Sequence, residues 1–274
     1  MERFRYQAIR LFLLAVLVVL CRYSVKIIQE RSAVSGVRIS DLEGDDFRAQ
    51  QLDEELLEKL QELYRFTGRA GLSEAVAATM FRGRFKPERF YMEAPMMELY
   101  KPKVWEAGKK AYRAVWADVE CFPVLGEEMF YEDSWLSPRG AGGERQHEGC
   151  DIFGAEDTPG HYPVVSMTDG AVEQVGWLPL GGYRIGIRSP QDGYFYYAHL
   201  DSYERAFRIG DKVQAGQVLG FMGNTGYGPE GTKGQFSTHL HLGIYIRTGD
   251  CPELSVDPYW ILRYLDGKKI GSKT

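Results

Sequence analysis

The pair His239 and His241 is the part of this sequence best suited to chemistry, because two of only five histidines stand two residues apart. They lie in an apolar run from residue 236 to 246, and alternate side chains of a β-strand share a face. Two neutral imidazoles on one face commonly hold a transition metal, zinc in particular. Taken alone, the pair is weak evidence, because a histidine is more often a hydrogen-bonded core or surface residue than a ligand, so other residues must decide.

A second pair, His147 and Asp151, stands four residues apart. This even spacing places both side chains on one side of an extended segment, and Asp151 is followed directly by Ile152 and Phe153. An unpaired carboxylate beside apolar residues is costly, and a metal ion removes that cost. With one histidine of the later pair these residues make a His/Asp/His set that leaves a fourth position for water, the arrangement expected of catalytic zinc.

His199 ends another strand-like segment, residues 197–200. Alone it would be interpreted as a structural histidine, but beside the two pairs it becomes a candidate catalytic group. Four of the five histidines then lie in or at the ends of expected strands. The fifth, His161, stands between Gly160 and Pro163 and is expected in a loop.

In this order the three motifs resemble the signature motifs of the lysostaphin/LytM-type zinc endopeptidases, which cut peptide bridges in bacterial peptidoglycan. The glycine-rich connections resemble that family as well. The similarity covers roughly residues 130–259, about half of the chain, and does not extend to the part before it. The segments that carry it are His147-x-x-x-Asp151, Tyr197-Ala198-His199-Leu200 and His239-Leu240-His241, with the connections at residues 163–170, 210–220 and 223–226.

The resemblance implies a division of labour among five side chains. His147, Asp151 and His241 would ligate one zinc ion, while His199 and His239 would stay unligated and face the water on that zinc. Zinc makes its water more acidic and polarises the scissile carbonyl, and an adjacent imidazole can move the proton and stabilise the oxyanion. Which of His199 and His239 is the general base stays open. The implied fold is a mainly antiparallel β domain of the duplicated hybrid motif type, with the site in a groove on one sheet.

The activity implied is that of a zinc metalloendopeptidase that hydrolyses peptide cross-links or stem peptides of peptidoglycan during cell-wall remodelling. A direct cross-link is favoured over a glycine bridge. Residues 227–237 form a longer, Gly/Pro/Lys-rich connection than the family usually has, and we expect this loop to line one wall of the groove. Residues 177–182 are expected at the groove edge too, with an ordinary turn as the alternative reading.

Two other functions fit parts of the sequence. A non-catalytic scaffold that binds the wall, or an activator of other wall hydrolases, would keep this fold but would be expected to lack ligands, whereas all five positions are filled here. A lipoyl- or biotinyl-type carrier would share the hairpin at residues 210–217, yet residues 221–224 offer no lysine for the cofactor.

The elements that must position these residues predict an α+β protein. Short β-branched and aromatic runs separated by glycine-rich turns follow Pro123, which predicts an all-β domain over residues 123–274. Its expected strands are residues 163–166, 171–175, 183–188, 194–199, 218–222 and 239–246.

A helical region of unknown role is predicted for residues 31–122. We expect an amphipathic helix over residues 52–63 that is ended by Gly68 and Gly71, a short helix over residues 73–80, and a third helix that begins near Pro102. The leucine and tryptophan stripes of this region are expected to pack against other elements, with substrate or partner binding as the alternative. The region could be a stalk, a docking module for a protein partner, or a regulator that covers the groove.

Residues 1–30 are laid out as a signal sequence or a membrane anchor. Arg3, Arg5 and Arg10 precede an apolar run over residues 11–21, and no small-residue cleavage site follows it directly. We therefore expect an uncleaved signal anchor that crosses the cell membrane once, with the catalytic domain outside the cytoplasm. A cleaved signal peptide on a secreted protein is the alternative, and a buried helix of a cytoplasmic protein is the third reading.

Composition limits the partners. A chain of 274 residues with a formal net charge of −5 and no basic patch is not expected to bind nucleic acid. None of the four cysteines forms a C-x-x-C motif, so we expect free or buried thiols, with a Cys121–Cys251 disulfide as the alternative outside the cell.

Overall fold

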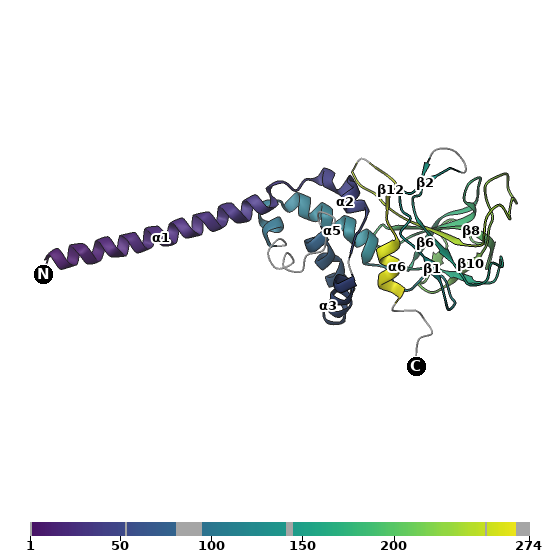
Figure 1. Ribbon diagram of the computed structural model, residues 1–274, viewed down its shortest axis with the longest axis horizontal. Coiled ribbons are helices and arrows are strands. Elements are labelled where there is room, and N and C mark those ends of the chain that lie inside the picture. The colour runs from purple at the N-terminus through teal and green to yellow at the C-terminus, as the bar shows by residue number, and fades with distance from the viewer. Residues whose placement is uncertain (1, 53, 81–94, 141–144, 250, 267–274) are drawn as a thin grey trace.

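The computed structural model describes residues 2–52, 54–80, 95–140, 145–249 and 251–266, and it consists of a helical part followed by an antiparallel sheet domain (Figure 1). This arrangement confirms the predicted α+β class. A long helix leads into a group of shorter helices, and these helices lie between the long helix and the sheet domain (Figure 1).

The described strands form one large antiparallel sheet and a small hairpin. The central strands of the large sheet carry the residues with chemical potential. Its order is β1 (Phe130–Tyr131), β4 (Cys150–Phe153), β11 (Leu240–Ile246), β8 (Tyr194–Tyr203), β7 (Gly182–Arg188), β6 (Gly170–Leu178) and β9 (Lys212–Val213); β10 (Val218–Met222) pairs with β5 (Pro163–Val165) and β8, β12 (Leu254–Val256) pairs with β11, and β2 (Pro138–Arg139) pairs with β3 (Arg145–Gln146).

All six predicted strands are present. β10 has the predicted bounds, and β11 begins one residue later than predicted because His239 makes only an isolated bridge to Gly223. In β11 the side chains of Leu240, Leu242 and Ile244 are fully buried, while His241 faces the other side of the sheet. Each buried aliphatic side chain contributes about 1.5–3 kcal/mol, so slipping the register by one residue would be strongly disfavoured.

The helical part shares one hydrophobic core with the sheet domain. Trp116 packs edge-on against Tyr264 at 5.9 Å between ring centroids and donates its indole N–H to Gln50 Oε1 at 2.7 Å. Arg48 donates through Nε and Nη2 to the backbone oxygen and hydroxyl of Ser255, at 3.0 and 2.8 Å. The apolar stripes of this region are therefore used for packing. The helices are α1 (Glu2–Ser35), the 3-10 helix η1 (Ile39–Glu43), α2 (Asp45–Arg48), α3 (Glu54–Met80), α5 (Pro102–Trp116) and, after the sheet, α6 (Tyr259–Asp266).

α3 corrects one prediction. The expected break at Gly68 and Gly71 does not occur, and one helix runs through both glycines. A glycine inside a helix costs about 1 kcal/mol relative to alanine. Burial of Leu60 and Val76 on either side of the glycines offsets that cost, because both side chains are fully buried.

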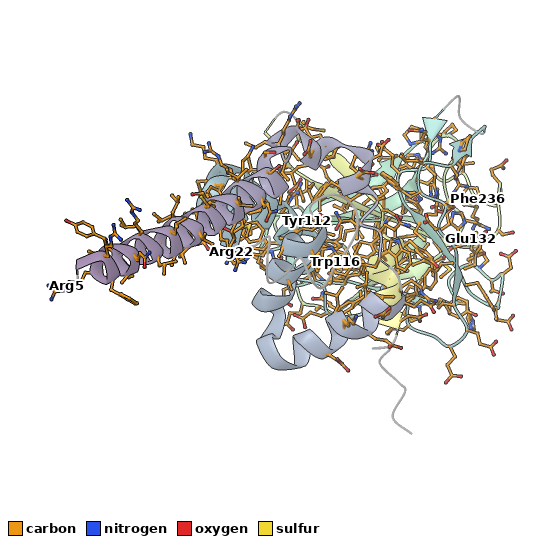
Figure 2. All side chains as sticks on the ribbon, turned by 60° about the vertical axis from the view of Figure 1, so that its left-hand side comes forward. Arg5, Arg22, Tyr112, Trp116, Glu132 and Phe236 are labelled. Atoms are coloured by element: carbon orange, nitrogen blue, oxygen red, sulfur yellow. The ribbon has the colours of Figure 1, made fainter. Side chains whose placement is uncertain are left out.

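α1 projects away from the rest of the chain, and it includes most of residues 1–30 and continues to Ser35 (Figure 1). The large apolar side chains over residues 4–25, Leu11 and Phe12 among them, are exposed, and Arg5 and Arg22 flank the most apolar stretch (Figure 2). Among the described residues α1 is the helix long and apolar enough to cross a membrane. An apolar helix with no protein packed around it is typical of a membrane segment or a signal sequence.

The cysteines are free thiols, so Cys121 and Cys251 are not joined in this structure. Cys121 is buried and donates to the Ser166 backbone oxygen at 3.2 Å. Burial raises the pKa of this thiol to about 11, which keeps it protonated and unreactive at neutral pH.

Candidate metal centre

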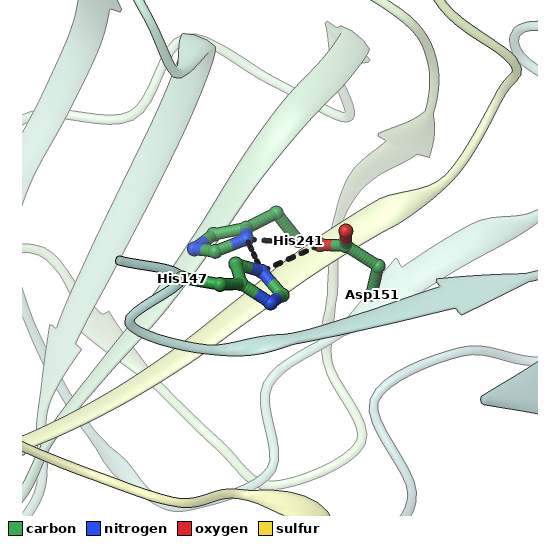
Figure 3. Close-up of side chains that lie close together, drawn as sticks. All are labelled: His147, Asp151 and His241. Atoms are coloured by element: carbon green, nitrogen blue, oxygen red, sulfur yellow. Dashed lines mark hydrogen bonds and ion pairs between the residues drawn. The ribbon is translucent and has the colours of Figure 1, made fainter. Parts of the chain in front are cut away.

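Three side chains from separate parts of the sequence converge at one point on the sheet (Figure 3). His147 Nε2 lies 3.0 Å from Asp151 Oδ1 and 3.0 Å from His241 Nδ1. Asp151 Oδ1 lies 3.0 Å from His241 Nδ1, so the three atoms form a nearly equilateral triangle. A point about 2 Å from all three atoms exists just off the plane of such a triangle, at the bond length that zinc makes to nitrogen and oxygen. The donor set therefore fits one zinc ion.

Strand register brings two of the donors together. Asp151 of β4 and His241 of β11 are direct partners across the antiparallel pair. Side chains that face each other in this way lie about 5 Å apart at Cβ, which leaves room for a small ion between their ends. His147 comes from the turn after β3, outside regular strand structure.

Gly149 allows the third donor to approach, although sequence reasoning did not single it out. A Cβ at this position would lie 2.5 Å from the Leu242 backbone oxygen and 2.6 Å from His241 Cε1. Both distances are shorter than any normal non-bonded contact, so only glycine leaves space for the His241 ring. Its place between His147 and Asp151 is the signal that could have revealed it.

Arg139 is a second residue that the sequence did not reveal. It lies on β2 and donates from Nη2 to Asp151 Oδ2 at 2.6 Å, which leaves Oδ1 directed at the two imidazoles. The same nitrogen is 2.8 Å from His147 Nδ1, but we assign the Nδ1 proton to the Ser134 backbone oxygen at 3.1 Å, because this leaves Nε2 able to act as a ligand. Residues 141–144 are not described, and nothing in the sequence marks this hairpin as part of the site.

Electrostatics keep the carboxylate ionised. Burial raises the pKa of Asp151, but the imidazoles of His147 and His241 outweigh burial and hold this pKa well below the usual range of a carboxyl group. Burial lowers the pKa of His241, so its ring is neutral at neutral pH. A charged carboxylate beside neutral imidazoles is the state in which these side chains bind a metal.

His199 and His239 lie beside the three donor side chains, with ring centroids 4.8 Å apart. His199 Nδ1 donates to the Thr225 backbone oxygen at 2.8 Å, and His239 Nδ1 donates to the Ser237 backbone oxygen at 2.8 Å. Each bond places the ring proton on Nδ1 and leaves Nε2 as an acceptor. His239 Nε2 is 3.8 Å from Asp151 Oδ1, within the same small space as the three donors.

Both rings are neutral. Burial lowers the pKa of His199 to about 3, with the neighbouring imidazoles of His239 and His241 as further causes. Burial also lowers the pKa of His239. Each ring is therefore able to accept a proton at neutral pH.

A β-bulge turns His199 into the site. β7 and β8 pair Tyr183 with Leu200 and Ile185 with Tyr197. Between these pairs β8 has one residue more than β7, and His199 lies in the resulting bulge. Its φ of +62° lies in the left-handed region, which is unfavourable for a residue other than glycine. The bulge places His199 on the groove face, whereas Tyr197 is fully buried on the other face.

A groove of about 1260 Å³ surrounds the five side chains. Both predicted loops line it, the first through Tyr227 and Phe236 and the second through Leu178 and Leu180. Among the described residues the lining begins at Pro138, so no described part of the helical region covers the groove.

The chain is similar to several known peptidases. Residues 145–255 match peptidase family M23. The L-Ala–D-Glu endopeptidase of Bacillus subtilis is 43% identical over 157 residues, which are 56% of this chain and 46% of that protein. Lysostaphin of Staphylococcus simulans is 35% identical over 99 residues, 35% of this chain and 17% of that protein. The chain thus spans less than half the length of these curated relatives.

A crystal structure of LytM from Ruminococcus gnavus, a protein named as a glycyl-glycine endopeptidase, is similar over a greater length, with 42% identity, a TM-score of 0.70, and coverage of 83% of this chain and 92% of that one. Residues 123–274 make up just over half of this chain, so the similarity extends into the helical region. The signature residues, the antiparallel sheet domain and the extent of this match together lead to one conclusion: the chain belongs to peptidase family M23.

Proposed function

We propose that this protein is a zinc-dependent endopeptidase that hydrolyses the stem peptides of bacterial peptidoglycan. The observation that carries the proposal is the triangle of donor atoms on His147, Asp151 and His241, with two further imidazoles that present unprotonated nitrogens beside it. A scaffold without activity would not need the two additional histidines. Their presence supports a catalytic role.

The side chains divide the chemistry between them. A zinc ion held by His147, Asp151 and His241 would supply Lewis-acid polarisation of the scissile carbonyl and a more acidic water. His199 or His239 accepts the proton of the attacking water at Nε2 and passes it to the nitrogen of the leaving amine. The backbone oxygens that accept from Nδ1 hold each ring in the required orientation throughout.

The bond we propose is that between L-alanine and D-glutamate. A relative named for that activity is 43% identical over 157 residues, whereas the lysostaphin match reaches 35% over 99 residues. The loop at residues 227–237, which lines the groove, is the part of this chain expected to select the bond. This proposal replaces the direct cross-link that the sequence alone favours.

We also propose that residues 1–30 anchor the protein in the cell membrane, with residues 123–274 as the zinc peptidase domain outside the cytoplasm. The exposure of every large apolar side chain near the start of α1 supports insertion into lipid. The helical region then joins the anchor to the peptidase domain through their shared core.

The test combines metal analysis with digestion of purified peptidoglycan and mass spectrometry of the released muropeptides. Wild-type protein should contain one zinc ion and release fragments that begin with D-glutamate. His241→Ala should lose the metal, and His239→Ala should keep it but lose turnover. His161→Ala is the matched control, because His161 is exposed and outside the groove lining, and it should behave as wild type. Equal digestion by wild type and His241→Ala would refute the proposal, and fragments cut between glycines would reassign the bond.

A further inference from the structure

Arg184 carries a positive charge in the groove and forms no ion pair with any described residue, although Glu253 lines the same groove. It lies on β7 and lines the groove. Its Nη2 makes one long hydrogen bond to Gln174 Oε1 at 3.4 Å, and its Nη1 is shielded from solvent without a hydrogen-bond partner. Within the described part of the chain Arg184 forms no ion pair. A guanidinium with unused donors in a partly closed groove is a site for an anion.

The other arginines near the groove are already engaged. Arg139 holds Asp151 at 2.6 Å. Arg145 donates to the Tyr227 hydroxyl and lies 5.7 Å from the centre of that ring. Arg139 also has a buried Nε without a partner, but its Nη2 is bound to a carboxylate, whereas Arg184 makes only the long hydrogen bond to the Gln174 amide.

A second arginine on the same strand has its guanidinium fully paired with a carboxylate. Arg188 grips Glu173 with two bonds of 2.6 Å, from Nε and from Nη2. This forked pair neutralises the charge of Arg188. It also provides a matched control for any experiment on Arg184.

Arg184 lies close enough to the metal-binding residues to contact a substrate residue near the scissile bond. β7 is two strands from β11, which carries His241, and neighbouring strands lie about 4.8 Å apart. The strand between them presents Tyr196 to the groove. Burial raises the pKa of Tyr196 to about 12, so its phenol is neutral and does not balance the guanidinium. An extended peptide advances about 3.3 Å per residue, which places a group one to three residues from the cleaved bond beside Arg184.

We propose that Arg184 binds the free carboxylate of the D-glutamyl residue on the leaving side of the cleaved bond. The inference rests on the proposed L-Ala–D-Glu specificity. In that substrate the D-glutamyl nitrogen is acylated by alanine, one carboxyl group continues the peptide, and the other is free and negatively charged. Arg184 therefore acts as a determinant of specificity for an acidic stem peptide, and it takes no part in proton transfer.

The experiment compares two synthetic stem peptides that differ only in this group, one with the free carboxylate and one with its primary amide. For wild type, kcat/KM should be at least about 10-fold higher for the carboxylate peptide, mainly through a lower KM, since charge-assisted hydrogen bonds are about twice as strong as neutral ones. Arg184→Gln should lose this preference by losing activity on the carboxylate peptide alone. Arg184→Lys should keep part of the preference, and Arg188→Gln should keep all of it.

Binding of both peptides, measured by calorimetry without turnover, separates this inference from the proposed function. Tighter binding of the carboxylate peptide that disappears in Arg184→Gln supports the role of Arg184 even if the bond cleaved is a different one. An unchanged preference in Arg184→Gln, with normal zinc content and thermal stability, would overturn the role of Arg184 while the endopeptidase assignment stands. Equal binding and cleavage of the two peptides by wild type would overturn it as well.

Discussion

Replacing Gly149 by alanine should disable the metal centre by a displacement that the structure allows us to calculate. The φ of Gly149 lies outside the left-handed region, so the backbone itself accepts alanine and space is the obstacle. The added Cβ would lie 2.6 Å from His241 Cε1 and 2.9 Å from His241 Nε2. It would also lie 2.5 Å from the backbone oxygen of Leu242, which β11 holds in place through its pairing with β4 and β8.

The expected effect follows from these distances. Carbon atoms in contact are normally about 3.5–4.0 Å apart, so the His241 ring must withdraw by about 1 Å. Metal–ligand distances tolerate about 0.2 Å, and a misplacement of about 1 Å at a catalytic centre can cost about 100-fold in rate. We therefore expect Gly149→Ala to lower zinc affinity by about 10–100-fold and kcat/KM by about 100-fold.

The assay is competition for zinc with a chromophoric chelator, followed by kinetics on a synthetic stem peptide with zinc in excess. Gly140→Ala is the control, because a Cβ at Gly140 meets nothing within 4 Å although this residue lines the same groove. A Gly149→Ala protein with the zinc affinity and turnover of wild type would refute the argument that close approach of His241 requires glycine.

Three further outcomes are expected. Arg139→Gln removes the donor from Asp151 Oδ2 and should lower zinc affinity by about 10–100-fold in the same competition assay; unchanged affinity would show that Arg139 does not position the carboxylate. Burial and the neighbouring Asp133 raise the pKa of Asp257 to about 8. The folded state therefore favours protonated Asp257, and the free energy of unfolding of wild type should fall as pH rises from about 4 to about 8. In Asp257→Asn this decrease should be smaller by at least about 1.4 kcal/mol, measured by denaturant titration of chelator-treated protein. Parallel pH profiles of the two proteins would contradict this. A chain that begins at Phe122 lacks the packing of Trp116 on Tyr264, so its free energy of unfolding should be lower by at least about 3 kcal/mol in thermal unfolding. Its peptidase activity should not increase. A large increase would instead support inhibition by the helical region.

Several features of the site could be predicted because they depend on local patterns. Alternation along residues 239–246 predicts that both histidines of the pair face one side, and His239 and His241 both line the groove. The glycine-rich turns between short apolar runs predict the strands, and each expected strand is present. The residues alone left open which histidine of the later pair completes the donor set; the family resemblance implied His241, and its Nδ1 lies with the other two donor atoms.

Local alternation gives the wrong face for His199. A regular strand would place it with Tyr197, which is fully buried, but the bulge places it in the groove with Tyr196. β8 pairs at this point with β7, its neighbour in sequence, and with β10, which follows it by 15 residues, and both pairings shift register here. The unbroken course of α3 through Gly68 has the same kind of cause, because burial against other elements outweighs local propensity.

The sequence by itself determined which side chains can do chemistry here and which segments become strands, because residue type and periodicity act over a few neighbouring positions. Only the tertiary structure decided that Asp151 lies opposite His241, that Arg139 orients the carboxylate, and that Arg184 Nη1 has no hydrogen-bond partner among the described residues. These outcomes depend on strand register and on hydrogen bonds between residues far apart in the chain. Such pairings form only when the whole core packs, so no local pattern records them.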